Sequence, residues 1–354
     1  MRRTGNEKKK GAGILATLAV FLVLGLAQEK KNGPTNFYEN SLHFTNRGLE
    51  FWYAKEQGGL ERITGLPFSE LPCAGCHVRS CDTCHKKEMK GKAAYSLERA
   101  RSQELCQGCH NFASLVEVQK NPTSPTADVH FRMGLQCMDC HTAREVHGDG
   151  IPYRSMRDAG AMDARCENCH EPAQLTCPGL HDHKGKLDCQ GCHVRDVPSC
   201  YNCHFETRVK EGKSRSLPIK NLLFLVNFDG RVTFGNLHTF VYQGKTMITF
   251  APSFPHLIMK KGRTCGECHA TSILQDLKAG RLKLIRFENG ELQNIQGIVP
   301  VVEGQNWGFI FLDFKEGRWV PLENAAEPLV NYAGFCSPLT PEQLAKLEKM
   351  PEQK

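Results

Sequence analysis

Apolar side chains are distributed unevenly, and they divide the chain into three stretches. An uncharged, mostly apolar run from Gly11 to Ala27 follows a basic start. From Cys73 to His204, leucine, isoleucine, valine and phenylalanine are sparse, whereas glycine, proline, aspartate and arginine are common. After residue 217, short apolar runs return. The pattern therefore predicts an export segment, then a segment of short helices and irregular loops, and finally a β-rich segment.

The C-terminal stretch has the pattern of paired strands. Its apolar runs alternate with turn dipeptides, which is typical of β-hairpins. The runs cover 222–226, 232–234, 240–242, 247–250, 282–287, 307–314 and 319–320, with turns at Asp229-Gly230, Gln243-Gly244, Asn289-Gly290 and Glu316-Gly317. Thr340, Pro341 and Glu342 then predict a short terminal helix, with a capping threonine and proline at its first position.

Residues 1–27 have the layout of a signal peptide. Arg2, Arg3 and Lys8 to Lys10 form a basic start, and Gly25 and Ala27 place small side chains before Gln28. The apolar run is short for a membrane span, and an uncleaved N-terminal anchor is the alternative interpretation. Either way the chain is expected to be exported, to the periplasm or the cell surface.

Charge and composition exclude some classes. The chain has 354 residues, 40% of them hydrophobic, and a formal net charge of +7. That composition argues against intrinsic disorder. Much of the positive excess lies in the first ten residues, and no basic stripe with interleaved aromatic residues follows, so a nucleic-acid partner is not expected.

Sixteen of the 18 cysteines form eight copies of the motif Cys-x-x-Cys-His. Two thiols at this spacing attach one haem c, and the adjacent histidine is placed to bind its iron. The motifs, numbered one to eight in chain order, are Cys73/Cys76/His77, Cys81/Cys84/His85, Cys106/Cys109/His110, Cys137/Cys140/His141, Cys166/Cys169/His170, Cys189/Cys192/His193, Cys200/Cys203/His204 and Cys265/Cys268/His269. Zinc knuckles are the simpler alternative, but zinc does not require a histidine after every second cysteine.

With these eight motifs, the chain resembles the multihaem c-type cytochromes over residues 73–269. The resemblance implies eight covalently bound haem c groups, attachment in the periplasm, and electron transfer between closely packed haems. Seven motifs fall between Cys73 and His204, which leaves little room for an ordinary hydrophobic core. The expected fold class is thus a multihaem cytochrome c with a haem-packed core of short helices and irregular loops, plus a β-rich C-terminal segment.

The same patterns predict domain boundaries. We expect a signal peptide at 1–27, a heptahaem domain at 28–217, a β-rich segment carrying the eighth haem at 218–336, and a short helix and tail at 337–354. The heptahaem segment resembles an internal duplication, because the sequence after Cys73 recurs after Cys189 with one change in seven residues.

The histidines supply a count. Eight belong to the motifs, and seven remain as candidate distal iron ligands: His43, His130, His147, His181, His183, His238 and His256. Seven cannot serve eight irons, so at least one haem is expected to lack a second histidine and to take methionine, lysine, water or no ligand. Candidate substitutes near the motifs are Lys86, Lys87, Met89, Lys90, Lys260 and Lys261.

Eight haems with one ligated differently also resemble the octahaem tetrathionate reductase and hydroxylamine oxidoreductase group. The first interpretation is an electron carrier whose partners are redox proteins, such as a membrane quinol oxidoreductase or a terminal reductase. The second is an enzyme acting on a small nitrogen or sulfur oxyanion at the odd haem. The third is a subunit of an extracellular cytochrome filament. Cys177 and Cys336 are left over, and they form a disulfide or remain as thiols.

Overall fold

The computed structural model describes residues 37–110, 127–175 and 183–351. The predicted signal peptide lies outside these ranges, as do His181 and Cys177. Among the described residues, none of the helices has the length and apolarity needed to cross a membrane. Residues 36–354 form one compact unit.

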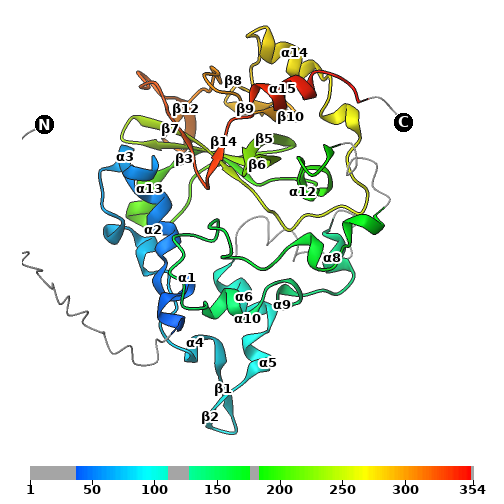
Figure 1. The fold of residues 1–354 in the computed structure, drawn as a ribbon. Helices are drawn as coiled ribbons and strands as arrows, with labels where there is room; N and C mark the ends of the chain where they lie inside the picture. The colour runs from blue at the N-terminus through cyan, green and yellow to red at the C-terminus, as the bar shows by residue number, and fades with distance from the viewer. Residues whose placement is uncertain (1–36, 111–126, 176–182, 352–354) are drawn as a thin grey trace, which may run out of the picture. The chain divides into compact units, whose positions relative to one another are not determined.

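The first half of the described chain consists of short helices joined by loops, as the sequence predicts (Figure 1). Its helices are η1 Phe37–Asn40, α1 Leu42–Thr45, α2 Arg47–Tyr53, η2 Lys55–Gln57, α3 Glu61–Thr64, η3 Phe68–Glu70, η4 Pro72–Gly75, α4 Asp82–His85, α5 Leu97–Ala100, α6 Gln103–Cys109, α8 Val129–Arg132, α9 Cys137–Cys140, α10 Ala143–His147, η5 Cys166–Asn168, η6 Pro172–Gln174 and α12 Cys189–His193. Helices this short are unstable alone, so other contacts must hold them. Side-chain caps from Ser41, Ser102 and Asp128 begin three of them.

One β-hairpin interrupts these helices, and the sequence patterns did not predict it. Strand β1 Lys86–Met89 pairs antiparallel with β2 Lys92–Tyr95. The turn residues Lys90 and Gly91 both have positive φ, 49° and 74°. This is the geometry of a two-residue hairpin turn. The signal that marks it in the sequence is the Lys-Gly dipeptide, since the flanking residues are too polar to show a strand pattern.

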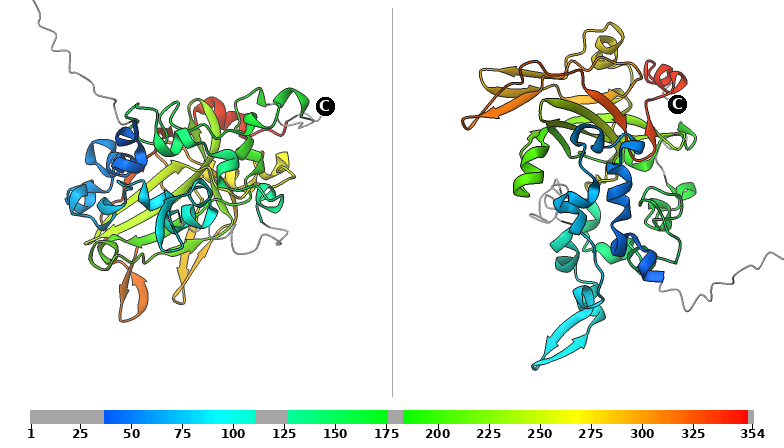
Figure 2. Two further views of the ribbon diagram at one scale, coloured as in Figure 1. Left: turned by 90° about the horizontal axis from the view of Figure 1, so that it is seen from below. Right: turned by 90° about the vertical axis from the view of Figure 1, so that its left-hand side faces the viewer.

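The second half is built on an eight-stranded sheet, which confirms the predicted β-rich segment (Figure 2). Its strands are β3 Ser199–His204, β4 Leu217–Ile219, β5 Leu222–Phe228, β6 Arg231–Tyr242, β7 Lys245–Pro252, β10 Gly297–Pro300, β13 Leu329–Tyr332 and β14 Cys336–Ser337. The long strand β6 pairs antiparallel with β5 and β7, across the turns predicted at 229–230 and 243–244.

Two smaller hairpins and four helices complete this half. They are β8 Ile285–Glu288 with β9 Glu291–Asn294, β11 Leu312–Lys315 with β12 Arg318–Pro321, and α13 Phe205–Glu211, η7 Cys265–Glu267, α14 Ser272–Lys278 and α15 Pro341–Leu347. Both hairpins turn at the predicted dipeptides. Helix α15 has Thr340 as its N-cap and proline in its first turn, so the predicted terminal helix is also confirmed.

The seventh motif departs from the expected helix. Residues 199–204 form strand β3, which pairs parallel with β6 and antiparallel with β4. The sheet therefore begins before residue 218, where the sequence predicts the β-rich segment to start. The reason is tertiary: β6 presents an open edge that the backbone of 199–204 can pair with, and this overrides the local helical preference of the motif.

Buried apolar side chains concentrate around the sheet. Phe224, Phe250 and Val299 are fully buried in the largest cluster, which lies between the sheet and the segments at 282–285 and 307–312. By contrast, among the described residues between Leu71 and Val194, Ala161 is the one buried hydrophobic side chain. The motif-bearing half thus has almost no hydrophobic core of its own.

Cys336 is buried at the start of β14. Its thiol donates a weak hydrogen bond to the Phe250 carbonyl at 3.6 Å, and burial raises its pKa to about 12. The expected partner of a disulfide, Cys177, lies outside the described residues.

Candidate haem sites

Most of the Cys-x-x-Cys-His motifs share one backbone turn. In motifs two, three, four, five and eight, the histidine N–H donates to the carbonyl of the first cysteine at 2.8–2.9 Å. This closes a single helical turn and brings the histidine beside the two thiols. A porphyrin edge bound by the thiols would therefore face the imidazole that the same turn presents.

Motif one departs from this turn. Its first residues form the tighter 3-10 helix η4, in which the Cys76 N–H donates to the Cys73 carbonyl and the His77 N–H to the Gly75 carbonyl, both at 3.0 Å. The Cys73 side chain packs against a hydrophobic cluster, whereas Cys76 is exposed. An α-helical turn carrying Cys76 and His77 is therefore a wrong expectation, because packing of Cys73 holds the segment in a turn that ends before Cys76.

Many of the motif thiols are open to solvent. Seven of the sixteen belong to exposed residues: Cys76, Cys81, Cys109, Cys140, Cys166, Cys169 and Cys265. The other nine are partly covered. Exposed thiols are accessible to an incoming porphyrin, as covalent attachment requires.

Five motif histidines each face a histidine from elsewhere in the chain. The pairs are His110 with His43, His85 with His147, His170 with His130, His141 with His256, and His269 with His183. The ring centroids lie 6.0–6.1 Å apart in all five pairs. All five non-motif histidines belong to the seven candidate distal ligands.

This spacing fits one iron between two imidazoles. A metal–imidazole nitrogen bond is about 2.0–2.1 Å, and each ring centre lies about 1.1 Å behind its nitrogen, so two rings on one metal stand about 6 Å apart. Direct ring stacking or a hydrogen bond between two imidazoles does not account for the same spacing at interplanar angles from 21° to 66°. The described residues of these five motifs therefore fit a haem ligated by two histidines.

The ring nitrogens are also arranged for iron binding. The Nδ1 atoms of His147, His193 and His269 donate to backbone carbonyls at 2.8–3.0 Å. This hydrogen bond fixes the tautomer that carries its proton on Nδ1, and it leaves the Nε2 lone pair for a metal. His77 makes a longer contact of the same kind, 3.3 Å to the Ala74 carbonyl.

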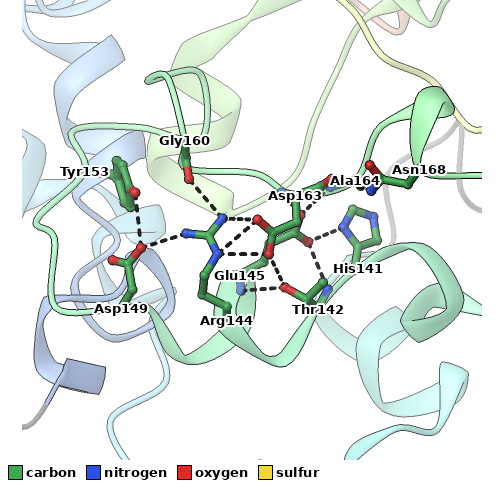
Figure 3. Close-up of polar contacts among 10 residues, drawn as sticks. All are labelled: His141, Thr142, Arg144, Glu145, Asp149, Tyr153, Gly160, Asp163, Ala164 and Asn168. Atoms are coloured by element: carbon green, nitrogen blue, oxygen red, sulfur yellow. Dashed lines mark hydrogen bonds and ion pairs between the residues drawn. The ribbon is translucent and has the colours of Figure 1, made fainter.

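A buried carboxylate supports the histidine of motif four (Figure 3). The His141 Nδ1–H donates at 2.7 Å to Glu145, whose side chain is 4% exposed. The other oxygen of Glu145 accepts the backbone N–H groups of Asp163 and Ala164, just before motif five. This carboxylate therefore ties motif four to motif five.

An arginine extends the same network. Arg144 binds Asp163 through two nitrogens and also binds Asp149 at 2.8 Å. The Arg144 and Thr142 contacts lower the pKa of Asp163. The network around Glu145 therefore stays charged at neutral pH.

Burial favours neutral imidazoles at several of these histidines. Burial, together with the neighbouring His110 and His147, lowers the pKa of His43. Burial and the nearby His141 likewise lower the pKa of His110 and of His256. A neutral imidazole is the form that binds a metal, because its nitrogen lone pair is free.

Three motif histidines face no other histidine among the described residues: His77, His193 and His204. The remaining candidate ligands are His181, outside the described residues, and His238 on β6. His238 is packed so closely that burial lowers its pKa to about 4, and its ring stacks on Phe240 at 6.2 Å. The structure thus narrows the predicted histidine deficit to motifs one, six and seven.

The geometry of motif seven differs from the rest. The positive φ of Asn202 and a register shift in β3 place Cys200 opposite His238, and Cys203 opposite Phe240. Both thiols therefore face the same side of the sheet. His204 pairs with Val241, on the opposite side, where its Nε2 donates to the Leu312 carbonyl at 2.9 Å. As it stands, this arrangement does not fit a haem held by both thiols and by His204.

The lysine and methionine candidates lie in solvent. Lys86, Lys87 and Lys90 are exposed on the β1–β2 hairpin, where Met89 is 56% exposed. Lys260 and Lys261 are exposed as well. They follow Met259, whose carbonyl accepts the His193 hydrogen bond, so they lie near motif six rather than motif eight.

Comparison with known proteins gives one distant relative. A cytochrome c-552 from Haemophilus ducreyi (strain 35000HP / ATCC 700724) is 24% identical over 165 residues, which cover 41% of this chain and 32% of the relative. The match thus spans about a third of the relative's length. No family model matches the chain, and no solved structure matches it. The similarity supports a c-type cytochrome with covalently bound haem.

The histidine pairs predict a spectroscopic result. Replacing His147 by alanine should turn one low-spin haem into a high-spin haem, because the His85 iron loses its second imidazole. Electron paramagnetic resonance of the oxidised protein measures this directly. The His43→Ala variant should add one high-spin haem of its own, and the double variant should add two. Unchanged low-spin signals in all three variants would contradict the pairing.

The Glu145 contact predicts a shift in potential. A carboxylate on His141 Nδ1 makes the imidazole a stronger donor, which favours the ferric state. Glu145→Gln should raise the potential of one haem by about 60 mV, equivalent to a tenfold change for a one-electron couple. A spectroelectrochemical titration resolves this, with Glu98→Gln, a carboxylate 88% exposed on its side chain, as the matched control. An equal shift in both variants would show that Glu145 acts only through its charge.

Proposed function

We propose that this protein is an exported octahaem c-type cytochrome that carries electrons along a row of covalently bound haems. The observation that supports it best is the set of five histidine pairs, each with the spacing that one iron requires. The eight Cys-x-x-Cys-His motifs would hold the haems, and each bound haem would supply an iron that takes up and returns one electron. The distant cytochrome c-552 relative agrees with this class.

The motifs follow one another in space, as a row of carriers requires. The thiol of Cys106 contacts Cys137, and that of Cys166 contacts Cys189, which joins motifs three and four and motifs five and six. Burial and then Cys106 raise the pKa of Cys84, which places motif two beside motif three.

Two further contacts extend the row. Burial and then Cys169 raise the pKa of Cys140, which places motif four beside motif five. Burial, with Cys192 as the second cause, raises the pKa of Cys268 to about 12, which places motif six beside motif eight. The order two, three, four, five, six, eight supports a continuous path for electrons.

Motifs one and seven lie together at the other side of motif two. Cys73 packs against the cluster that contains Phe205 and Phe240, and Phe240 is the register partner of Cys203. Arg208 lies near both Cys73 and Cys203 and opposes the rise that burial causes in their pKa values. Three residues separate motif one from motif two along the chain, so the two adjoin. The partners at the ends of this row would be redox proteins of the periplasm or cell surface.

A second candidate function is an enzyme that reduces or oxidises a small nitrogen or sulfur oxyanion. It is favoured by one specific observation, the three motif histidines that face no described histidine. An iron with one protein ligand can bind a substrate, whereas an iron with two histidines cannot without losing one. His77, His193 and His204 mark the three sites at which such chemistry would occur.

The haem count tests the proposal. Denaturing mass spectrometry of the holoprotein should show eight haems added to the chain, and a Cys200→Ser/Cys203→Ser variant should lose one of them. The control is Cys336→Ser, which should lose none. Seven haems with an unmodified Cys200–Cys203 peptide would remove motif seven from the proposal. Five or fewer, in a host with complete cytochrome maturation, would overturn it.

Ligand stoichiometry separates the carrier from the enzyme. For the enzyme, one to three irons per chain should bind carbon monoxide in the reduced state and nitrite in the oxidised state, because those irons lack a second histidine. Optical titration against the total haem count gives the number. No binding at any iron would leave the carrier as the function, with a methionine or another side chain completing each site.

A further inference from the structure

The β1–β2 hairpin is a surface with no structural task of its own. It extends away from the neighbouring helices in Figure 1 and in the right-hand view of Figure 2. Every residue of β1 is exposed, and in β2 only Ala94 is partly covered. A two-stranded hairpin that buries no apolar face is marginally stable. Its exposed side chains therefore contribute little to the fold.

The hairpin grows directly out of a haem ligand. Strand β1 begins at the residue after His85, and the backbone N–H of Ser96, just past β2, donates to the His85 carbonyl at 2.8 Å. The Tyr95 ring lies 6.5 Å from the His85 ring, and its hydroxyl binds Asp82 in the same motif. His85 in turn pairs with His147. The base of the hairpin is thus the backbone of motif two.

The hairpin carries a local positive charge beside exposed apolar groups. Residues 86–95 contain four lysines, Lys86, Lys87, Lys90 and Lys92, and one acidic residue, Glu88, for a net charge of +3. All four lysines are exposed. Lys86 and Lys87 make ion pairs at 3.5 and 3.6 Å with Asp82 and Glu98, and exposed pairs of this kind are weak.

The apolar side chains on and beside the hairpin are unusually open to solvent. Met89 is 56% exposed, Tyr95 68% and Leu97 73%. Basic side chains around apolar ones form a surface suited to a partner that is acidic at its rim and apolar at its centre.

We propose that the β1–β2 hairpin is the docking surface for an acidic redox protein, and that the motif-two haem is the site through which electrons pass between that protein and this chain. The inference rests on the proposed cytochrome function. A partner held on the hairpin lies next to the haem ligand from which the hairpin arises, so docking and electron exchange occur at one place. Lysines at this surface attract an acidic partner over about 30 Å at 0.01 M salt, and over about 3 Å at 1 M.

An acidic protein fits this surface better than other polyanions do. The sequence carries no basic stripe with interleaved aromatic residues of the kind that follows a nucleic-acid backbone. The lysines are confined to one short hairpin, and that hairpin is attached to a redox centre.

The test measures electron transfer at the hairpin. The oxidised holoprotein is mixed in stopped flow with reduced plant-type ferredoxin, an acidic carrier with a potential near about −400 mV. A variant with Lys86→Glu, Lys87→Glu, Lys90→Glu and Lys92→Glu should react at least about tenfold more slowly at low salt. Its rate should approach the unmodified protein's rate at high salt. Transfer from the reduced holoprotein to basic mitochondrial-type cytochrome c should become faster.

The matched control changes the same net charge elsewhere. Lys220, Lys245, Lys283 and Lys315 are exposed residues of the sheet half, and all four are changed to glutamate. This control should slow ferredoxin by much less than the hairpin variant. Equal slowing in the two variants, or none in either, would overturn the proposal. The four-fold lysine-to-glutamine variant should give an intermediate rate, and it decides the matter if the glutamate variant does not fold.

Two further measurements keep the interpretations apart. The visible spectrum and haem mass of each protein are recorded first, so absence of haem shows failure of the proposed function before any rate is measured. Sedimentation velocity follows the oligomeric state. A dimer of the unmodified protein that the hairpin variant loses would assign the surface to a second copy of this chain. Tighter binding of duplex DNA than of ferredoxin would assign it to nucleic acid. Either result would overturn the proposal.

Discussion

The motif-bearing half of this protein cannot be held together by hydrophobic burial. Between Leu71 and Val194 the described residues bury one hydrophobic side chain, Ala161, and their helices span one or two turns. Chains of this length normally rely on a continuous apolar core to offset the loss of conformational entropy. Covalent attachment at each motif and iron–imidazole bonds across the chain would supply what the missing core does not. On this view the cofactor is both the redox centre and the main packing element.

The histidine pairs show how such bonds would organise the chain. His43 precedes every motif yet faces His110 of motif three, and His256 follows β7 yet faces His141 of motif four. Each pair closes a long loop, much as a disulfide does, and so reduces the freedom of the unfolded chain. The sheet half thereby takes part in the haem-binding half. It contributes His256, and it also contributes the carbonyls of Met259 and Lys346 that orient His193 and His269.

Local surroundings differ from one motif to the next, and this gives the chain a means of setting different potentials along the row. His141 is held by a buried carboxylate, whereas His147, His193 and His269 are held by neutral carbonyls. A carboxylate partner favours the oxidised iron more than a carbonyl does. The sheet places the Cys200 and Cys203 thiols on one face and His204 on the other. Motif seven therefore has the most unusual environment of the eight.

The sequence by itself determined the chemistry. Cysteine and histidine at fixed local spacing identify the attachment sites, since the motif acts within a single turn and needs no tertiary information. Alternating apolar runs with Asp-Gly, Asn-Gly and similar turns likewise marked the hairpins around Asp229 and Asn289, because hairpin pairing is local. Only the tertiary structure decided which spare histidine faces which motif, because those pairs join residues that are distant in the chain. It alone placed motif seven on strand β3, where pairing with β6 overrides local preference, and it alone tightened the turn before Cys76, where Cys73 packs against a distant cluster. It also revealed the lysine hairpin at His85, because that hairpin buries nothing and so leaves no hydrophobic pattern to read.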